Sequence, residues 1–329
     1  MKNQTQIHTY LHHKFYRNLQ DLKLNVNINP IIIAISGGQD SICLIKLLQD
    51  FKKYLKPLLK IEYIYIDHQW KNDSIYQVKH LSNFIKNMHE KIYVYQIKHI
   101  TTSEKHARKL RYQLIIKHSI KYKKVTIMTA HTETDKIETF WLQIMRGTGI
   151  NGATSLNKQI ILDNGIQFLR PLINFKRADL YWFCRQFCLP IWSDITNYTY
   201  HINRNRLRNE LIPYIKQYFQ NNIEQQIQKF LDICQIDNEY IKQNAIKLYL
   251  MSRHSKNIAL NYTLIKKQHI ALQKRTLQIF FYHNLNIILY HDILNQLIRF
   301  IKEDMNTHNN TITIKRINLI IYRNWIYIS

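Results

Sequence analysis

The feature that most constrains the fold is an apolar run at residues 31–35 that leads into the sequence Ser-Gly-Gly-Gln-Asp-Ser at 36–41. The run is rich in isoleucine, which is typical of a buried parallel strand. Apolar residues at helical spacing follow at 42–48, so the pattern predicts a strand, a tight turn and the start of a helix. Backbone N–H groups and the positive end of a helix dipole meet at such a turn, which suits it to bind phosphate.

Asp40 is the unusual residue of this turn, because a carboxylate beside phosphate groups is best explained as a ligand of an accompanying Mg²⁺ ion. A Walker loop would need Gly-Lys followed by Ser or Thr, which the turn lacks. The six residues resemble the PP-loop of the ATP pyrophosphatases, enzymes that cleave ATP to AMP and pyrophosphate. An ordinary strand-to-helix turn with two glycines is the alternative interpretation.

Strand-like and helical patterns alternate as far as residue 188, which predicts an α/β fold with a doubly wound parallel sheet. The resemblance at 36–41 implies that this sheet is of the PP-loop ATP pyrophosphatase type. Amphipathic helices dominate from about residue 217, so we expect a smaller, mainly helical C-terminal domain. The boundary is placed near residue 215, giving domains 1–215 and 216–329. The predicted strands are 31–35, 61–66, 92–97, 125–128, 160–162 and 166–169. The predicted helices are 11–22, 74–89, 103–120, 176–188, 223–246, 271–282 and 288–301. Two β-like stretches, 311–314 and 319–328, close the chain.

One turn in this pattern has a specific signature. Asp163-Asn164-Gly165 joins the strands at 160–162 and 166–169, and this sequence predicts a hairpin with a type I′ turn.

Polar residues follow two of the predicted strands, where ligands of open α/β sheets bind. Asp67 and His68 end one strand, and His131 leaves another. His131, Asp135 and Glu138 have the spacing i, i+4 and i+7, so we expect them on one helical face directed at the same crevice as the turn at 36–41. A structural role is the more common one for a single histidine, but three functional groups at one edge favour catalysis.

Arginines form two further groups. Arg108 and Arg111 share a helical face with Glu104 and Tyr112, for which a solvated ion-pair face is the alternative. Three arginines at 204, 206 and 208 predict a phosphate clamp, with a surface charge run as the alternative.

The net charge points to a polyanionic partner. Lys and Arg total 47 against 22 acidic residues, a formal charge of +25, and nucleic acid is the first candidate. AT-rich coding explains part of the lysine excess, but it does not explain the clustered arginines.

Cysteine spacing and hydropathy exclude other classes. The four cysteines form no CxxC pair, so no zinc or iron–sulfur site is expected, and they are interpreted as core thiols in a reducing compartment. No apolar run is long enough to span a membrane, and residues 1–30 lack the apolar segment of a signal peptide, so no membrane partner is expected.

The order of these blocks resembles the tRNA(Ile)-lysidine synthase family. The resemblance covers roughly residues 30–212, with a compatible layout beyond 216 that is similar to the family's helical tRNA-binding domain. Thr134, Lys136 and the segment 69–71 depart from the family pattern. The matching blocks are Ser36–Ser41, Asp67-His68, Glu104 to Tyr112, Ala130-His131 with Asp135 and Glu138-Thr139, Arg146 to Gly149, Arg170-Pro171-Leu172, and Asp194 with Asn197 to Arg208.

The resemblance implies a carbon–nitrogen ligase that converts the wobble cytidine of an isoleucine tRNA with a CAU anticodon to lysidine. O2 of the cytosine attacks the α-phosphate of ATP, pyrophosphate leaves, and free L-lysine then displaces AMP at C2. ATP and Mg²⁺ are the implied cofactors, and isoleucine tRNA and lysine the partners. We expect a protein of the plastid stroma, plastid-encoded, with the bacterial cytoplasm as the alternative, and a homodimer as one open arrangement.

On this reading the residues divide by role. Asp40, His131 and Glu138 are catalytic, with His131 at the α-phosphate or in proton transfer. We expect Arg108, Arg111 and Glu138 to bind lysine, and Asp40 and Asp135 to bind the metal. We expect Arg204, Arg206 and Arg208 to bind tRNA. The residues expected to bind ATP are Ser36, Gly37, Gly38, Gln39, Asp40, Ser41, Asp67 and His68.

Three other functions stay open at this point. A tRNA thiolase shares the PP-loop but normally uses cysteine pairs that this chain lacks. An amidotransferase-type synthetase would need a glutaminase that is not visible. An RNA-binding protein with a decayed ATP site is the non-enzymatic reading, and retention of both Asp40 and His131 argues against it.

Overall fold

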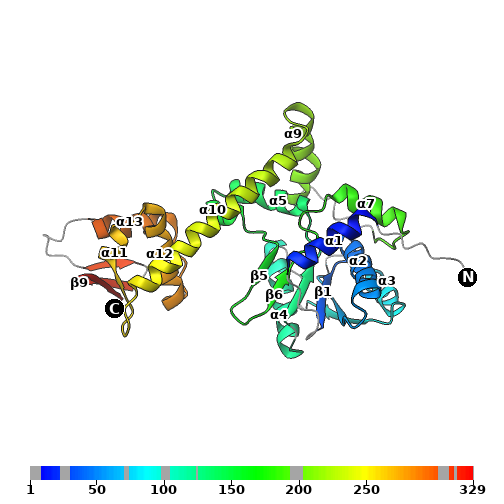
Figure 1. Cartoon of the computed structure of the whole chain (residues 1–329), viewed down its shortest axis with the longest axis horizontal. Coiled ribbons are helices and arrows are strands. Elements are labelled where there is room, and N and C mark those ends of the chain that lie inside the picture. Colours follow the sequence, from blue (N-terminus) through cyan, green and yellow to red (C-terminus); the bar gives the residue numbers. More distant parts are fainter. Residues whose placement is uncertain are drawn as a thin grey trace, which may run out of the picture. The chain divides into compact units, whose positions relative to one another are not determined.

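The computed structural model describes residues 9–22, 30–69, 74–97, 104–123, 125–192, 203–302, 311–314 and 317–328. The chain forms two compact units, residues 1–230 and 231–329 (Figure 1). Helix α10 (Ile223–Ser252) contributes to both. The expected boundary near residue 215 falls in α9 (Ile212–Tyr218), and the division into domains 1–215 and 216–329 stays a prediction.

The first unit is built on a six-stranded sheet of order β3-β2-β1-β4-β6-β5. All neighbouring pairs are parallel except β5 with β6, which form an antiparallel hairpin at the edge. The predicted doubly wound parallel sheet is confirmed. The strands are β1 (Ile31–Ile35), β2 (Ile61–Asp67), β3 (Lys91–Gln96), β4 (Thr126–Thr129), β5 (Gln159–Ile161) and β6 (Gln167–Leu169).

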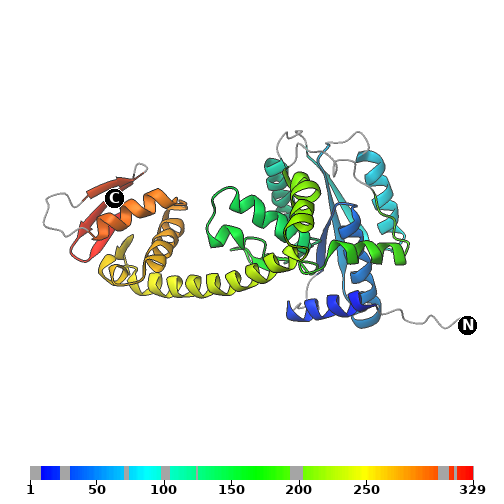
Figure 2. The same cartoon turned by 90° about the horizontal axis from the view of Figure 1, so that it is seen from above.

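Helices cover both faces of this sheet (Figure 2). Strand β1 explains why: Ile31 and Ile33 pack into one apolar core with α1, α2 and α7, whereas Ile32 packs into a second core with α4. A strand buried on both faces needs the continuous apolar run seen in the sequence. The helices are α1 (Tyr10–Asp21), α2 (Gln39–Leu55), α3 (Ser74–Lys86), α4 (Glu104–Lys121), α5 (Glu133–Ile144), α6 (Ile150–Ala153), α7 (Arg177–Gln186), α8 (Asn203–Arg206), the π-helix η2 (Leu207–Leu211) and α9.

The β5–β6 hairpin is present, but its turn type differs from the prediction. Leu162 and Gly165 are joined by a backbone hydrogen bond of 2.9 Å from Gly165 N–H to the Leu162 carbonyl. Only Gly165 has a positive φ (78°), whereas a type I′ turn needs positive φ at both central residues, Asp163 and Asn164. Among the described backbone angles the pattern is that of a type I turn followed by a glycine bulge, which also reverses the chain.

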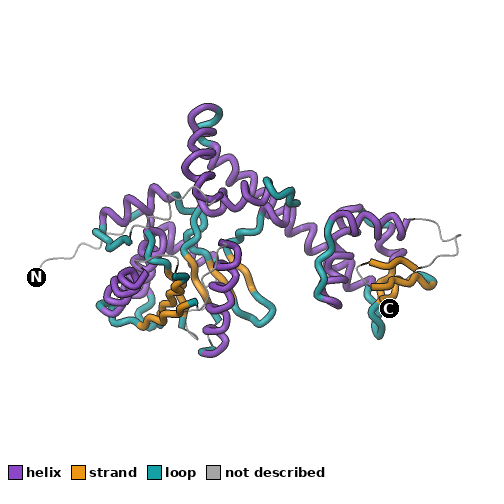
Figure 3. The backbone as a smooth tube through the Cα atoms, turned by 180° about the vertical axis from the view of Figure 1, so that it is seen from behind, coloured by secondary structure: helices purple, strands orange, loops and turns teal. Residues whose placement is uncertain are grey.

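The second unit combines helices with a small sheet (Figure 3). The helices α11 (Tyr262–Lys266), α12 (Ile270–Leu285) and α13 (His291–Lys302) share one apolar core with the sheet. The second predicted β-like stretch is two strands, because Arg323, at φ 52°, reverses the chain between them. The sheet, of order β7-β10-β9-β8, contains β7 (Ala259–Asn261), β8 (Thr311–Ile314), β9 (Ile317–Tyr322) and β10 (Trp325–Ile328).

No described helix has both the length and the apolar character needed to cross a membrane.

The turn between β1 and α2 is held from outside by α3. Gly37 has φ +79°, a conformation that favours glycine. The Gln77 side chain of α3 donates to the Ser36 carbonyl at 2.8 Å and accepts from the Tyr65 hydroxyl at 3.2 Å. A Cβ at Gly37 would lie 2.9 Å from Nε2 of Gln77. The turn therefore depends on both the backbone freedom of Gly37 and the space its missing side chain leaves.

We expect Gly37→Ala to lower the free energy of unfolding by at least about 1 kcal/mol, because alanine is strained at this φ and its Cβ displaces Gln77. Gly38→Ala is the control, since Gly38 has φ −74° and its Cβ would meet Oγ of Ser36 at an ordinary 3.7 Å. Urea unfolding of both variants measures the difference. Equal losses would show that the turn does not depend on Gly37.

Candidate active site

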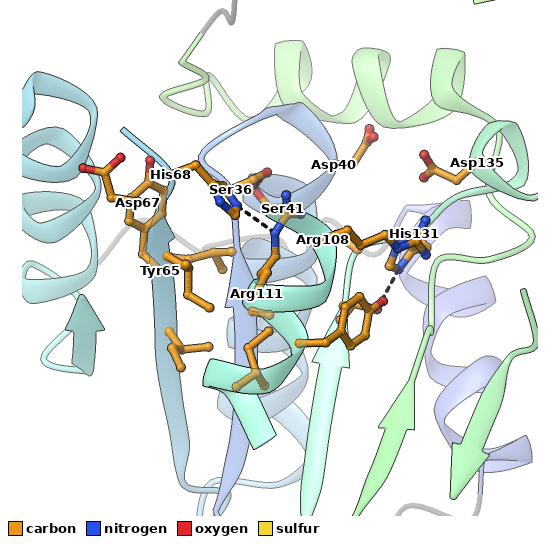
Figure 4. A pocket seen from close by; sticks show the side chains of 18 of the residues that line it. Ser36, Asp40, Ser41, Tyr65, Asp67, His68, Arg108, Arg111, His131 and Asp135 are labelled. Carbon is orange, nitrogen blue, oxygen red and sulfur yellow. Dashed lines mark hydrogen bonds between the residues drawn. The ribbon is translucent and has the colours of Figure 1, made fainter. Parts of the chain in front are cut away.

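A cavity of about 410 Å³ lies at the carboxyl ends of β1, β2 and β4. The turn at 36–41 and the start of α5 form part of its wall, and α4, α8 and η2 contribute side chains. Figure 4 shows how side chains from these separate elements converge. The predicted residues that line it are Ser36, Asp40, Ser41, Asp67, His68, Arg108, Arg111, His131, Asp135, Glu138, Arg204 and Arg208.

The turn at 36–41 leaves the first turn of α2 open to a ligand. Gly38 is the N-cap residue, and no side chain caps the helix. The Ser41 hydroxyl donates to the Gly38 carbonyl at 2.9 Å and lies 3.4 Å from the Ser36 hydroxyl. Gly37, Gly38 and Gln39 are not among the residues that line the cavity, and the Gln39 side chain donates to the Arg177 carbonyl at 3.0 Å. Uncapped amides at a helix start are the donors that phosphate oxygens need.

Asp40 and Asp135 face each other across the cavity (Figure 4). Burial raises the pKa of Asp40 to about 6; Arg177 opposes this shift and the Asp135 carboxylate adds to it. Oδ2 of Asp135 accepts hydrogen bonds from the backbone N–H and the hydroxyl of Thr132, at 2.8 and 3.1 Å. Burial opposes ionisation of Asp135, but His131 and the Thr132 backbone N–H outweigh it and lower the pKa of Asp135. A cation beside the two carboxylates would offset the unfavourable effect of Asp135 on the charge of Asp40.

A Mg²⁺ ion fits this pair. The described residues hold no group of three His, Cys, Asp or Glu side chains that could bind a metal by themselves. Mg²⁺ commonly takes one or two carboxylates and completes its shell with substrate phosphates and water. Asp40 and Asp135 could therefore hold such an ion when a polyphosphate lies beside them.

His131 lies before α5 rather than within it. Thr132 is the N-cap residue of the helix, so the expected single helical face holds Asp135 and Glu138, while His131 joins them from the β4–α5 loop. Its Nδ1 is 2.8 Å from the Thr129 hydroxyl. Burial lowers the pKa of His131 to about 3, which the nearby Asp135 offsets only in part. The imidazole is neutral at physiological pH.

Glu138 is fully buried and forms an ion pair with Arg208. Its Oε1 accepts from Nε of Arg208 at 2.6 Å, and its Oε2 is buried without a hydrogen-bond partner among the described residues. Burial raises the pKa of Glu138 although Arg208 opposes the shift. The cavity wall thus contains a carboxylate oxygen with unsatisfied acceptor capacity.

Arg108 and Arg111 both line the cavity from α4. Nε of Arg111 donates to Nε2 of His68 at 3.0 Å, and the Arg108 guanidinium lies 5.8 Å from the Tyr112 ring centre. Burial lowers the pKa of His68 to about 4, and Arg111 lowers it further, so the ring is a neutral acceptor. Asp67 accepts from the Gln69 backbone N–H at 2.8 Å.

The three clustered arginines do not share one surface. Arg204 and Arg208 are four residues apart on a helical segment and line the cavity, with Nη2 of Arg204 3.4 Å from the Thr139 hydroxyl. Arg206 lies on the opposite side and pairs with Glu210 at 3.0 Å. In a helix the residues at i and i+4, here Arg204 and Arg208, share a face, whereas the residue at i+2, Arg206, points away from it. The three arginines therefore do not form the single phosphate clamp that their spacing in the sequence suggested.

Sequence reasoning missed two positioning residues. Arg170 is 3% exposed, donates to the Asn157 carbonyl at 2.6 Å and contributes to the low pKa of His131. Gln77 lines the cavity and holds the turn at 36–41. The block containing Arg170 was a usable signal, whereas nothing local marks Gln77. Asp194, Asn197, Trp70 and Lys71, which the sequence comparison also used, lie outside the described residues.

We expect Asp40→Asn to stabilise the ligand-free protein at pH 7.5 by about 1–3 kcal/mol. The folded-state pKa of Asp40, about 6, lies above its ordinary value of 3.8, so ionisation weakens folding as pH rises through this window. Asparagine removes that cost. Thermal unfolding from pH 3.5 to 7.5 should show no gain at the acidic end and a growing gain above pH 4. An equal effect at every pH would contradict the assignment.

Comparison with known proteins identifies the family. A PP-loop domain model matches residues 11–215. The chain is 49% identical to the chloroplastic tRNA(Ile)-lysidine synthase of Gracilaria tenuistipitata var. liui over 98% of this chain and 99% of that protein. It is 35% identical to the chloroplastic tRNA(Ile)-lysidine synthase of Pyropia yezoensis, over 92% of this chain and 91% of that protein. It is 33% identical to the tRNA(Ile)-lysidine synthase of Nostoc sp., over 82% of each chain.

A solved structure shares the fold. A U34-tRNA thiolase from Methanococcus maripaludis aligns with a TM-score of 0.53 and 13% identity, over 68% of this chain and 78% of the thiolase. The likeness to this structure concerns the fold, whereas the sequence identities reach across both units. The chain belongs to the tRNA(Ile)-lysidine synthase family of PP-loop proteins.

Proposed function

We propose that this protein ligates free L-lysine to C2 of the wobble cytidine of the isoleucine tRNA with a CAU anticodon, through an adenylated cytidine, releasing AMP and pyrophosphate. The observation that carries the proposal is the meeting of an uncapped PP-loop turn with the buried carboxylate of Glu138 in one cavity. The turn suits the ATP half of the reaction. The carboxylate suits an ammonium substrate.

The ATP half needs donors for the departing pyrophosphate and a cation to offset its charge. The amides and hydroxyls at residues 36–41 supply donors, and Asp40 with Asp135 would hold Mg²⁺, which supplies the positive charge. Asp67 and His68 remain candidates for nucleotide contacts at the end of β2.

His131 is assigned to the α-phosphate in preference to proton transfer. A group with a pKa of about 3 is a poor proton acceptor near neutral pH. With Nδ1 held by the Thr129 hydroxyl, Nε2 is the ring atom left to contact a phosphate oxygen. Low basicity and this orientation both favour a hydrogen-bonding role.

Lysine carries one carboxylate and two ammonium groups, so its site needs both signs of charge. Glu138 would bind an ammonium through Oε2, while Arg208 holds Oε1. Arg108 or Arg111 would bind the carboxylate from α4 across the cavity. A fully buried carboxylate discriminates well, because a neutral ligand leaves it unsatisfied.

The tRNA would be held mainly by charge. The formal charge of +25 suits a polyanion, and Arg206 is the most accessible of the three arginines, with its side chain 61% exposed. Arg204 and Arg208 would contact the tRNA only where it enters the cavity. The C-terminal unit is proposed as the second tRNA-binding part, and a homodimer is one possible assembly.

The plastid stroma is the proposed location, with a plastid gene as the source. The relatives from Gracilaria and Pyropia are described as chloroplastic, and the Ile-, Lys- and Asn-rich composition suits an AT-rich genome.

Mass spectrometry of nucleosides tests the function directly. Isoleucine tRNA transcript, ATP and lysine incubated with the protein should yield lysidine, with AMP and pyrophosphate in equal amounts. Omission of lysine should abolish the product. A thiolated nucleoside formed with a sulfur donor, or free use of ornithine in place of lysine, would overturn the proposal.

We expect Glu138→Gln to raise the lysine concentration needed for half-maximal rate by about tenfold or more, because the amide keeps the shape and loses the charge. Isotope exchange between pyrophosphate and ATP and tRNA affinity should change much less. Glu133→Gln is the matched control, since Glu133 is also buried on α5 but does not line the cavity. Joint loss of all three activities would assign Glu138 to the fold or the metal.

A further inference from the structure

We propose that a second cavity in the first unit receives the base of a nucleotide next to the reacting cytidine. The inference rests on the proposed function, because it assumes that an anticodon loop reaches the first cavity. The second cavity measures about 650 Å³ and lies between the end of α5 and the segment from α8 to α9. It includes Arg146, from a sequence block to which no role has been given above.

The two cavities share their walls. On α5, Glu138 lines the first cavity and Leu142 lines the second, one helical turn or about 6 Å further along. On the segment from α8 into η2, Arg208 lines the first cavity while Arg206 and Leu207 line the second. Helix α5 packs against both α8 and η2. The helical segment from α8 into η2 therefore has one cavity on each side, and neighbouring nucleotides of an unstacked loop, whose bases are splayed apart, would place one base in each.

The lining of the second cavity suits a flat aromatic ligand. Leu142, Leu207 and Leu211 supply apolar surface, and Tyr214 and Met145 stand at the edge. Tyr214 is 55% exposed and Met145 is 60% exposed, so both side chains are accessible to a ligand. Unpaired bases are bound in this way, by stacking on aromatic side chains.

Charge at the rim fits the backbone of the same nucleotide. Arg146 and Arg206 are exposed cations at the cavity, and Glu210 is the one acidic side chain among the residues that line it. The Arg206–Glu210 pair, at 3.0 Å with both side chains largely exposed, is weak enough to be exchanged for a phosphate contact. Glu210 and Asn203 then offer polar atoms to the base edge. Two arginines beside an apolar slot favour a nucleotide over an uncharged ligand.

Two exposed tyrosines of α9 allow a matched test. Tyr214 lines the cavity, whereas Tyr218, one turn later and 64% exposed, does not. Their ring centres are 4.8 Å apart, so both substitutions disturb the same surface. Fluorescence anisotropy with a labelled anticodon stem-loop RNA measures binding by the wild-type protein, Tyr214→Ala and Tyr218→Ala. We expect about tenfold weaker binding for Tyr214→Ala and little change for Tyr218→Ala, since stacking on one aromatic ring contributes a factor of this order.

Abasic RNAs identify what Tyr214 contacts. The stem-loop is made without the base on the 5′ side of the reacting cytidine, and separately without the base on its 3′ side. Wild-type protein should bind one of these two RNAs about tenfold more weakly than the intact RNA, and Tyr214→Ala should show no further loss with it. Equal affinity of Tyr214→Ala and Tyr218→Ala, or abasic losses that are the same in wild type and Tyr214→Ala, would overturn the proposal.

Failure of the proposed function gives a different result. If the wild-type protein makes no lysidine but the binding cycle shows the expected coupling, the base site stands and the chemistry is wrong. If lysidine forms and the coupling is absent, the base site is wrong and the ligase assignment stands. Thermal unfolding of both tyrosine variants confirms that each is folded at the assay temperature.

Discussion

The ion pair between the buried Glu138 and the partly exposed Arg208 connects the two segments on which the active site depends. It joins α5, which carries Asp135, to η2, which closes the cavity wall. Removing Arg208 would leave the buried Glu138 carboxylate without its charged partner, whereas Arg208, with its side chain 23% exposed, keeps access to solvent. The pair also leaves Oε2 of Glu138 without a partner among the described residues, so the same interaction that fixes the wall leaves acceptor capacity for a substrate.

The charged groups in the cavity are arranged favourably for bound ligands but unfavourably for the stability of the ligand-free protein. Asp40 and Glu138 both have raised pKa values because they are buried, and the neutral His131 and His68 add no positive charge. A site that holds ATP and a cation must keep such groups in place, although they reduce the stability of the free protein. Functional sites often retain groups that are unfavourable for folding.

Much of the fold was predictable because it depends on local pattern. The apolar run at 31–35, the glycine turn and the strand–helix alternation predicted the sheet correctly, and a cavity lies at the edge of the sheet where the site is expected. Local details that depend on a single residue were harder to predict from the sequence. His131 precedes the helix because Thr132 caps it, and the hairpin turn takes positive φ only at Gly165. Strand β7 has three residues, too few to show a period in the sequence.

Long-range contacts could not be predicted from spacing at all. Gln77 reaches the Ser36 carbonyl across 41 positions, and Arg208 reaches Glu138 across 70. Charge and motif order singled out Arg204, Arg206 and Arg208 together, but only the helical structure through 203–218 shows that Arg206 lines a different cavity from the other two. Local pattern therefore predicted secondary structure better than it predicted the partners of individual side chains.

The π-helix at Leu207–Leu211 affects where the Arg208 side chain lies. A π-helical turn contains about one residue more than an α-helical turn, so the side chains within and after it are rotated relative to those of a regular α-helix. A shift of one residue in an α-helix turns a side chain by about 100°. Applied to Arg208, such a change of register would withdraw the guanidinium from Glu138 and leave both carboxylate oxygens open, with most of the helix unchanged. The contact between Arg208 and Glu138 therefore depends on the place of the extra residue within this short segment.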